Sequence, residues 1–395
     1  MMPKERSRVA LFLRNLNGGG AERVMLNLAQ GFAQKGLKVD LLLTKAEGNY
    51  LSQVPPEVRL VDFNAAQFDK GKKIKFPTSL QSTTSLPKLV SYLRNEKPTA
   101  LLSATHFPNE IAVLAKHIAR VPTRVVVSEH ITLSVESRRV DQVSSRITPQ
   151  TARLFYPWAN GIVAVSTGAA QDLSRITNIP LERIQVIYNP VVNPQLLENA
   201  KQSVDHPWFA AGEPPVVLGV GRLVEQKDFS TLIRAFAKVR QSRPARLMIL
   251  GNGKERKRLD ALISELGIEN DVAMLGFTNN PYAYMAKAAV FVLSSAWEGL
   301  PTVLIEALAA GAQVVSTNCE SGPEEILAGG KYGDLVPVGD SQAMAQSILS
   351  VLSGNSKTVD PSWIDQFSWE TSTQKYIDML GLAPDFQAAN LLKTI

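Results

Sequence analysis

The sequence predicts an α/β protein with two doubly wound, Rossmann-like domains that face each other across a cleft. Three observations support this prediction: short apolar runs of strand length alternate with segments of helical periodicity, a stretch rich in proline, asparagine and glutamine interrupts the alternation, and the alternation then begins again. Alternating strands and helices form parallel sheets that helices cover on both faces. A chain of 395 residues is long enough for two such domains.

The first series begins with a strand, a glycine-rich loop and a helix. Arg8–Leu13 is an apolar run, Gly18–Gly20 follow it, and Ala21–Lys35 carries apolar residues at helical spacing. The same pattern recurs before residue 190. The other elements predicted in this half are strands at Leu37–Leu43, Ala100–Ser103, Arg124–Ser128, Gly161–Val165 and Ile184–Ile187, and helices at Glu110–Ala119 and from Gly168.

The pattern changes near Tyr188-Asn189-Pro190, and residues 190–215 have the composition of an interdomain segment. A second series follows it. Its predicted strands are Val216–Val220, Leu247–Leu250, Val272–Leu275, Val290–Leu293 and Gln313–Ser316, and its predicted helices are 228–240, 254–266, 281–288 and 302–310. The resulting division is a first domain at 1–195, a linker at 196–213, a second domain at 214–361 and C-terminal helices at 362–395.

Composition indicates a protein without disulfides or a membrane span. Cys319 is the only cysteine, so no intrachain disulfide can form. No run approaches 18 uninterrupted apolar residues, and the apolar run Val9–Leu13 is too short for the core of a signal peptide. We therefore expect a cytoplasmic location.

Charge is distributed unevenly along the chain. Residues 1–195 carry a net charge of +11 and residues 196–395 a net charge of −5. The densest basic segment is Lys70–Phe76, and Arg138-Arg139 follows further on. This segment suits either peripheral contact with the anionic cytoplasmic face of a membrane or a solvated loop. Nucleic acid is not an expected partner, because neither zinc-finger spacing nor an RNP-type aromatic motif is present.

In doubly wound sheets, ligands bind outside the carboxyl ends of the strands, so functional residues should follow strands directly. Gly18-Gly19-Gly20 meets this condition, because it ends the first strand and opens a helix. Such a turn lets a ligand approach the backbone closely and offers a helix N-terminus to phosphate. A tight turn without a ligand is the alternative, and Arg23 stands where the dinucleotide fingerprint needs a glycine.

Two cations follow the first strand of the second domain. Arg222 and Lys227 lie five residues apart in Gly221-Arg222-Leu223-Val224-Glu225-Gln226-Lys227, between a strand end and a helix start. Arginine through its planar fork and lysine as a point charge can hold a diphosphate together. Two solvated surface cations are the alternative.

Two carboxylates follow a later strand of the same domain. Glu298 precedes a predicted helix, and Glu306 lies about one turn into it among apolar neighbours, where a carboxylate needs partners. Both can accept hydrogen bonds from sugar or ribose hydroxyls. The backbone N–H groups of Gly299 and Leu300 lie close to that helix start. Helix capping by Glu298 and solvation of Glu306 are the alternative.

One histidine ends a strand of the first domain. His130 follows Ser128-Glu129 and could donate to a transferred sugar, although a structural histidine fits equally well and His106 is a rival. Gly322-Pro323 sets a rigid turn in the segment from Cys319 to Ile326, and Cys319 has no partner thiol for a redox role.

Taken together, these segments resemble the family-four retaining glycosyltransferases of GT-B fold. The resemblance covers nearly the whole chain, and its most specific part is GRLVEQK followed by EGLPTVLIEALAAG; GGGAER and GPEEIL agree in order and spacing. Within the family it is closest to bacterial enzymes that extend lipid-linked oligosaccharides or surface polysaccharides. The chain departs from the family where Asn318-Cys319-Glu320 replaces the Asp-Cys-Pro often found before Ser-Gly-Pro, which leaves the donor sugar open.

The resemblance implies a role for each candidate residue. It implies that Arg222 and Lys227 bind the donor diphosphate, that Glu306 binds the ribose, and that Thr278 lies near the base. The further implied contacts are Glu298, Gly299 and Leu300 with the donor sugar, His130 with the sugar near its 6-hydroxyl, and Gly19 and Gly20 with the phosphate and reaction centre. His130, Arg222, Lys227 and Glu298 form the implied catalytic set.

The resemblance also implies that the second domain binds a nucleotide sugar, with UDP as the expected nucleotide, and the first domain a glycan or polyprenyl-diphosphate-linked acceptor. The C-terminal helices are implied to cross back to the first domain. No Asp-x-Asp occurs in the sequence, so we expect the two cations to replace a metal and no cofactor to be needed. We expect a front-face, retaining transfer of a hexose or N-acetylhexosamine. A nucleotide-sugar 2-epimerase and a non-catalytic binding protein are the rival interpretations.

Overall fold

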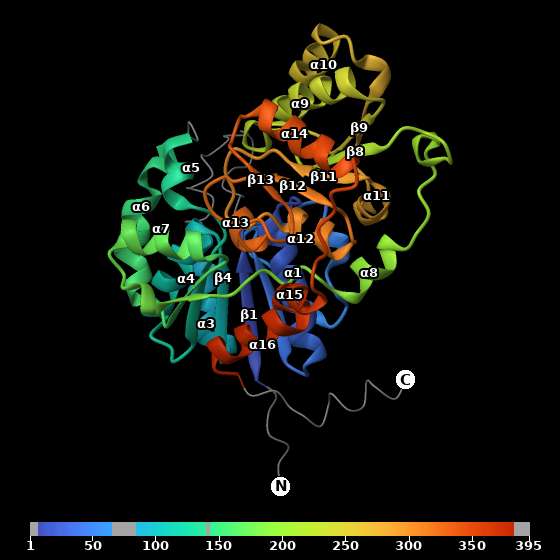
Figure 1. Ribbon diagram of the computed structural model, residues 1–395. Coiled ribbons are helices and arrows are strands. Elements are labelled where there is room, and N and C mark those ends of the chain that lie inside the picture. Colours follow the sequence, from blue (N-terminus) through green and yellow to red (C-terminus); the bar gives the residue numbers. More distant parts are fainter. Residues whose placement is uncertain (1–6, 65–83, 140–142, 383–395) are drawn as a thin grey trace, which may run out of the picture. The chain divides into compact units, whose positions relative to one another are not determined.

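The computed structural model describes residues 7–64, 84–139 and 143–382, and it divides the chain into two compact units (Figure 1). Unit 1 comprises Met1–Pro190 and Trp369–Ile395, and unit 2 comprises Val191–Ser368. The chain therefore passes between units at Pro190, before the expected linker. The segment 196–213 instead forms part of unit 2, where it contains most of helix α8 (Pro194–Ala200) and the 3₁₀ turn η4 (Pro207–Phe209).

Unit 1 is built on a seven-stranded parallel sheet with strand order β3-β2-β1-β4-β5-β6-β7. The direction of winding reverses between β1 and β4, as in a doubly wound fold. The edge strand β3 was not predicted. Only its first residue is buried, so its sequence lacks the continuous apolar run of a central strand. The strands are β1 (Arg8–Leu13), β2 (Lys38–Leu43), β3 (Val58–Asp62), β4 (Ala100–Ala104), β5 (Arg124–Glu129), β6 (Gly161–Ala164) and β7 (Ile184–Val186).

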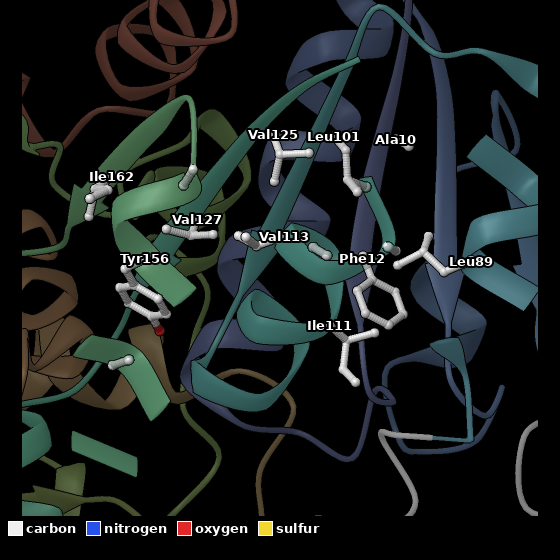
Figure 2. Close-up of a cluster of buried hydrophobic side chains, with 14 of the residues drawn as sticks. Ala10, Phe12, Leu89, Leu101, Ile111, Val113, Val125, Val127, Tyr156 and Ile162 are labelled. Atoms are coloured by element: carbon white, nitrogen blue, oxygen red, sulfur yellow. The ribbon is translucent and has the colours of Figure 1, made fainter. Parts of the chain in front are cut away.

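Helices cover both faces of this sheet because successive strand residues point to opposite sides. Ala10 and Phe12 of β1 point to one core, which Figure 2 shows with residues from β4, β5, α3 and α4. Val9 and Leu11 point to the second core, which α1 and α16 close. The helices are α1 (Gly20–Gln34), α3 (Leu86–Glu96), α4 (His106–Ala119), α5 (Leu133–Arg139), α6 (Val143–Phe155), α7 (Thr167–Thr177) and α16 (Trp369–Leu380).

The last described helix, α16, belongs to unit 1 although it follows unit 2 in sequence. It packs on α1 at Gly31, where a Cβ atom would lie 2.6 Å from the Thr373 hydroxyl oxygen, so the two backbones approach closely. The side-chain amide of Asn27 in α1 donates to the carbonyl of Pro190 at 2.8 Å, and the backbone carbonyl of Asn27 accepts from the Trp369 indole at 2.6 Å. One residue thus binds both places where the chain leaves and re-enters unit 1.

Unit 2 is built on a six-stranded parallel sheet with strand order β10-β9-β8-β11-β12-β13, and its winding reverses between β8 and β11. The strands are β8 (Val216–Val220), β9 (Arg246–Leu250), β10 (Val272–Gly276), β11 (Val290–Leu293), β12 (Val314–Thr317) and β13 (Asp334–Val336). The helices besides α8 are α9 (Phe229–Ser242), α10 (Arg256–Glu265), α11 (Pro281–Lys287), α12 (Thr302–Ala309), α13 (Pro323–Ile326), α14 (Ser341–Leu352) and α15 (Pro361–Ile364).

Short 3₁₀ turns complete the connections. They are η1 (Leu51–Gln53), η2 (Tyr156–Trp158), η3 (Leu181–Arg183), η5 (Glu225–Lys227), η6 (Glu269–Asp271) and η7 (Asp365–Phe367). The prediction of two doubly wound α/β domains is confirmed. The basic segment Lys70–Phe76 lies outside the described residues, and within those residues no helix has the length and apolarity needed to cross a bilayer.

Replacing Ile377 with alanine should destabilise unit 1. The Ile377 side chain of α16 is fully buried in the second core, and truncation of a buried isoleucine removes apolar contacts and leaves a cavity. We expect a loss of about 2–5 kcal/mol in the free energy of unfolding, measured by denaturant titration.

The neighbouring Asp378→Ala variant is the matched control, because Asp378 is exposed on the same helix. It should change the free energy of unfolding by less than about 0.5 kcal/mol. Equal effects of the two substitutions would contradict the packing of α16 into this core.

Candidate functional site

The candidate site of unit 2 lies where the winding of its sheet reverses. β8 and β11 are neighbouring parallel strands, with Val217 aligned to Val290. Their carboxyl ends therefore open at the same edge, which is the position where doubly wound sheets bind ligands. The loop from Gly221 follows β8, and the loop from Ser294 follows β11.

Backbone and side-chain hydrogen bonds hold these two loops together. The N–H of Ala296 donates to the carbonyl of Gln226 at 2.8 Å, and the Ser294 hydroxyl donates to the carbonyl of Lys227 at 2.7 Å. The Gln226 amide donates to the carbonyl of Trp297 at 3.0 Å. The side chains that the two loops carry are therefore fixed relative to one another within unit 2.

An ion pair forms the centre of this arrangement. Lys227 Nζ lies 2.5 Å from Glu298 Oε1, and the Glu298 side chain is only 8% exposed. The same carboxylate accepts from the Ser295 hydroxyl at 2.6 Å and from the Gln226 amide at 3.5 Å. A buried carboxylate needs such donors, because its desolvation would otherwise cost several kcal/mol. The structure thus brings together a cation predicted for the diphosphate and a carboxylate predicted for the sugar.

The other predicted residues of unit 2 lie in loops and helix starts of the same sheet. Arg222 follows β8 and is exposed, and its side chain makes no hydrogen bond or ion pair with any residue that the structure describes. Glu306 is half-buried in the second turn of α12, and Thr278 is half-buried in the loop after β10. Gly299 and Leu300 are buried just before α12. Arg222 and Thr278 follow strands, and Gly299 and Leu300 precede α12, as the sequence predicted, while Glu306 lies one turn into that helix.

The last residue of β12 and the loop after it also bond to the Glu298 loop. The Thr317 hydroxyl donates to the carbonyl of Ser295 at 2.6 Å, and the Ser321 hydroxyl donates to the carbonyl of Gly299 at 2.8 Å. Burial raises the pKa of the Cys319 thiol to about 12, and the nearby Glu298 carboxylate adds to the shift. The thiol therefore stays protonated at neutral pH and is not a reactive thiolate.

Gly19, Gly20 and His130 lie in unit 1. Gly19 is the N-cap of α1, and a Cβ atom on Gly20 would have no neighbour within 4 Å, so the backbone there is open to approach. Arg23 is used within unit 1, since it stacks on Tyr50 and donates to Gln53 at 2.6 Å. His130 follows β5, and its Nε2 lies 3.1 Å from the Ser128 hydroxyl oxygen.

His130 and its rival His106 are both neutral at pH 7. Burial lowers the pKa of His130 to about 4. Burial, with a smaller contribution from the Arg14 guanidinium, lowers the pKa of His106 to about 4 as well. The Nδ1 atom of His106 is buried without a hydrogen-bond partner among the described residues. Both histidines can therefore offer a neutral imidazole at the carboxyl edge of the unit 1 sheet.

Sequence reasoning did not identify the residues that hold the ion pair in place. Gln226 and Ser295 both stand inside the predicted motifs, directly beside or three residues before a candidate, and they donate to the Glu298 carboxylate. Thr317 lies in β12, outside every motif, and nothing in the sequence indicated its bond to the Glu298 loop. The first two could have been found by asking which neighbours carry donors for a buried carboxylate.

Gly322→Ala should disturb the loop that carries Glu298. Gly322 has φ +97°, and a Cβ atom there would lie 2.5 Å from Cδ of Pro301, whose ring cannot rotate away. Relieving this overlap must displace the chain between Glu298 and α12. We expect the free energy of unfolding of unit 2 to fall by about 1–3 kcal/mol more than in the control variant Gly330→Ala.

Gly330→Ala is the matched control for this variant. Gly330 has nearly the same φ, +95°, but the nearest neighbour of a Cβ atom there would be 3.7 Å away. Both variants place a Cβ atom at a positive φ of nearly equal size, so the comparison tests the contact with Pro301. Indistinguishable urea midpoints for the two variants would show that the contact does not constrain the loop.

Two family models match the chain. Residues 201–362 match the family described as Glycosyl transferases group 1, and residues 18–192 match the family described as Glycosyltransferase Family 4. A relative from Campylobacter jejuni, N-acetylgalactosamine-N,N'-diacetylbacillosaminyl-diphospho-undecaprenol 4-alpha-N-acetylgalactosaminyltransferase, is 31% identical over 87% of this chain and 90% of its own length.

Two further comparisons extend the likeness. The lipopolysaccharide core biosynthesis glycosyltransferase LpsE of Rhizobium meliloti is 27% identical over 93% of this chain and 97% of its own. The crystal structure of HepE from Anabaena in complex with UDP superimposes with a TM-score of 0.66 at 21% identity, covering 98% of this chain and 100% of that one. Likeness of this kind to solved glycosyltransferases shows the GT-B fold. From its two family matches and its relatives, the chain belongs to the family-four, group 1 glycosyltransferases, and it is a glycosyltransferase.

Proposed function

We propose that this glycosyltransferase moves a hexose or an N-acetylhexosamine from a UDP-sugar to a lipid-linked glycan, without a metal ion and with retention of the anomeric configuration. One observation carries the proposal: the loops after β8 and β11 bring Lys227 to Glu298. The Arg222 side chain has no partner among the described residues, so it is available to bind an anion. Cations for a diphosphate and a carboxylate for sugar hydroxyls thus stand at one strand edge of unit 2.

Donor binding exchanges the partner of Lys227. In the structure Lys227 Nζ lies 2.5 Å from Glu298 Oε1. A nucleoside diphosphate brings more negative charge than one carboxylate, so Lys227 turns to the phosphates and Arg222 joins it through its planar fork. Glu298 keeps its bonds from Ser295 and Gln226 and accepts from hydroxyls of the donor sugar. Glu306 accepts from the ribose, and Thr278 lies beside the base.

The same two cations replace a metal ion in the proposed mechanism. Negative charge develops on the β-phosphate as the sugar–phosphate bond breaks, and fixed cations stabilise that charge. The acceptor hydroxyl attacks from the face that the diphosphate leaves, and a phosphate oxygen takes its proton, so the configuration is retained. We nominate no carboxylate as a covalent nucleophile.

The acceptor class follows from the relatives. The Campylobacter jejuni relative is named for a diphospho-undecaprenol-linked substrate, and the Rhizobium meliloti relative for lipopolysaccharide core biosynthesis. The net positive charge of residues 1–195 suits an acceptor with an anionic diphosphate. We propose that unit 1 binds this acceptor and that the protein works in the cytoplasm at the inner face of a membrane. The HepE structure with UDP supports UDP as the nucleotide.

Isothermal titration of the full chain with UDP, GDP, ADP and a panel of UDP-sugars, in the presence of a chelator, tests the donor proposal. UDP should bind in the chelator, because the site uses Arg222 and Lys227 in place of a metal. Arg222→Ala should weaken UDP binding by at least about 10-fold, equal to about 1.4 kcal/mol. The UDP-sugar that binds most tightly names the candidate donor.

Arg234→Ala is the control for charge alone. Arg234 is an exposed arginine of α9 in the same unit, and its side chain makes no hydrogen bond or ion pair with any described residue. Its replacement should leave UDP affinity within about 2-fold. Equal losses in both arginine variants would contradict a specific diphosphate site, and binding that requires added metal would contradict metal independence.

A further inference from the structure

Ser128 of β5 is hydrogen-bonded on two sides. Its hydroxyl oxygen lies 2.9 Å from the Tyr376 hydroxyl oxygen and 3.1 Å from Nε2 of His130. Tyr376 comes from α16, which is 248 residues away in sequence but belongs to the same unit. Three side chains of unit 1 therefore form one chain of hydrogen bonds that ends at His130.

The burial of the two hydroxyls determines the direction of this chain. Tyr376 and Ser128 are both 0% exposed, so neither can bond to bulk water. Among the described residues, the Tyr376 hydroxyl has Ser128 as its one hydrogen-bond partner, so its hydrogen must be donated to Ser128 Oγ. An unmade hydrogen bond of a buried donor is costly, which excludes the reverse direction.

The hydrogen of Ser128 then has one acceptor left. Its hydroxyl oxygen contacts Tyr376 and His130 and no other described group, and Tyr376 is already the donor. Ser128 therefore donates to Nε2 of His130. An imidazole nitrogen that accepts a hydrogen bond carries no proton, so the proton of the neutral ring is on Nδ1.

We propose that Tyr376 is a positioning residue: through Ser128 it holds His130 in the tautomer that carries its proton on Nδ1 and offers Nδ1–H as a hydrogen-bond donor. Burial lowers the pKa of His130 to about 4, so the ring remains the neutral acceptor that this chain requires at pH 7. The consequence for catalysis rests on the proposed function, in which His130 donates to a hydroxyl of the transferred sugar. The tautomer itself does not depend on that function.

The tautomer can be measured in the ligand-free protein. The full chain contains four histidines, so selective ¹⁵N-histidine labelling and long-range ¹H–¹⁵N correlation spectra at pH 7 resolve each ring, and His130→Gln assigns the signals of His130. We expect the wild-type ring to be protonated on Nδ1. Tyr376→Phe and Ser128→Ala should each increase the fraction protonated on Nε2.

Tyr156→Phe is the matched control. Tyr156 is also 0% exposed in unit 1, but its hydroxyl donates to Glu129 at 2.8 Å and does not contact Ser128. This variant should keep the wild-type tautomer. Protonation of wild-type His130 on Nε2, an unchanged tautomer in both Tyr376→Phe and Ser128→Ala, or an equal change in Tyr156→Phe would overturn the proposal.

Activity separates this inference from the proposed function. Tyr376→Phe should lower kcat for transfer by about 5-fold or more while UDP affinity, a property of unit 2, stays within about 2-fold. If the tautomer changes as expected but transfer does not, the positioning of His130 by Tyr376 stands and the role of His130 toward the sugar fails. If the tautomer does not change, the positioning fails whatever the activity.

Discussion

The buried ion pair between Lys227 and Glu298 is the interaction on which the candidate site depends. A carboxylate that is 8% exposed is stable only with donors around it, and Lys227, Ser295 and Gln226 supply them. Because these donors come from the loops after two neighbouring strands, the pair also fixes those loops against each other. The loops of the site are therefore organised by the protein's own hydrogen bonds, and Lys227 is held beside the position proposed for the diphosphate.

The architecture explains why such a pair can form. In a sheet wound 3-2-1-4-5-6, the first and fourth strands are neighbours, and their two following loops diverge to opposite faces of the sheet. Residues 71 positions apart, such as Lys227 and Glu298, thereby meet at one edge. The same winding recurs in unit 1, where the glycine loop follows β1 and His106 opens the helix after β4.

The sequence was sufficient to predict most of the fold. Buried central strands such as β1, β8 and β11 were predicted at or within a residue of their bounds, because a strand buried on both faces is a continuous apolar run. The edge strands β3 and β13 were missed, since they are short and partly exposed and leave a weaker pattern. The position of α15 in unit 2, and not with the C-terminal helix α16, depends on tertiary packing that no local pattern records.

Prediction of the site succeeded for residue types and failed for pairings. The motifs identified Lys227 and Glu298 separately, one as a cation for phosphate and the other as an acceptor for sugar hydroxyls. That the two are bonded to each other depends on the pairing of β8 with β11. The bond between Ser128 and Tyr376, which are 248 residues apart, likewise depends on the packing of α16 in unit 1. Such pairings are set by how elements pack, so the structure was needed to find them.

The measurement that tests the account most directly compares UDP affinity in Lys227→Met and Glu298→Gln by isothermal titration. If Lys227 leaves Glu298 for the diphosphate, Lys227→Met should weaken UDP binding by about 10-fold or more, or about 1.4 kcal/mol. Glu298→Gln keeps the shape of the side chain and releases the lysine from its competitor, so UDP should bind at least as tightly as in the wild type. A loss of UDP affinity in Glu298→Gln as large as that in Lys227→Met would contradict the exchange and assign the ion pair a purely structural role.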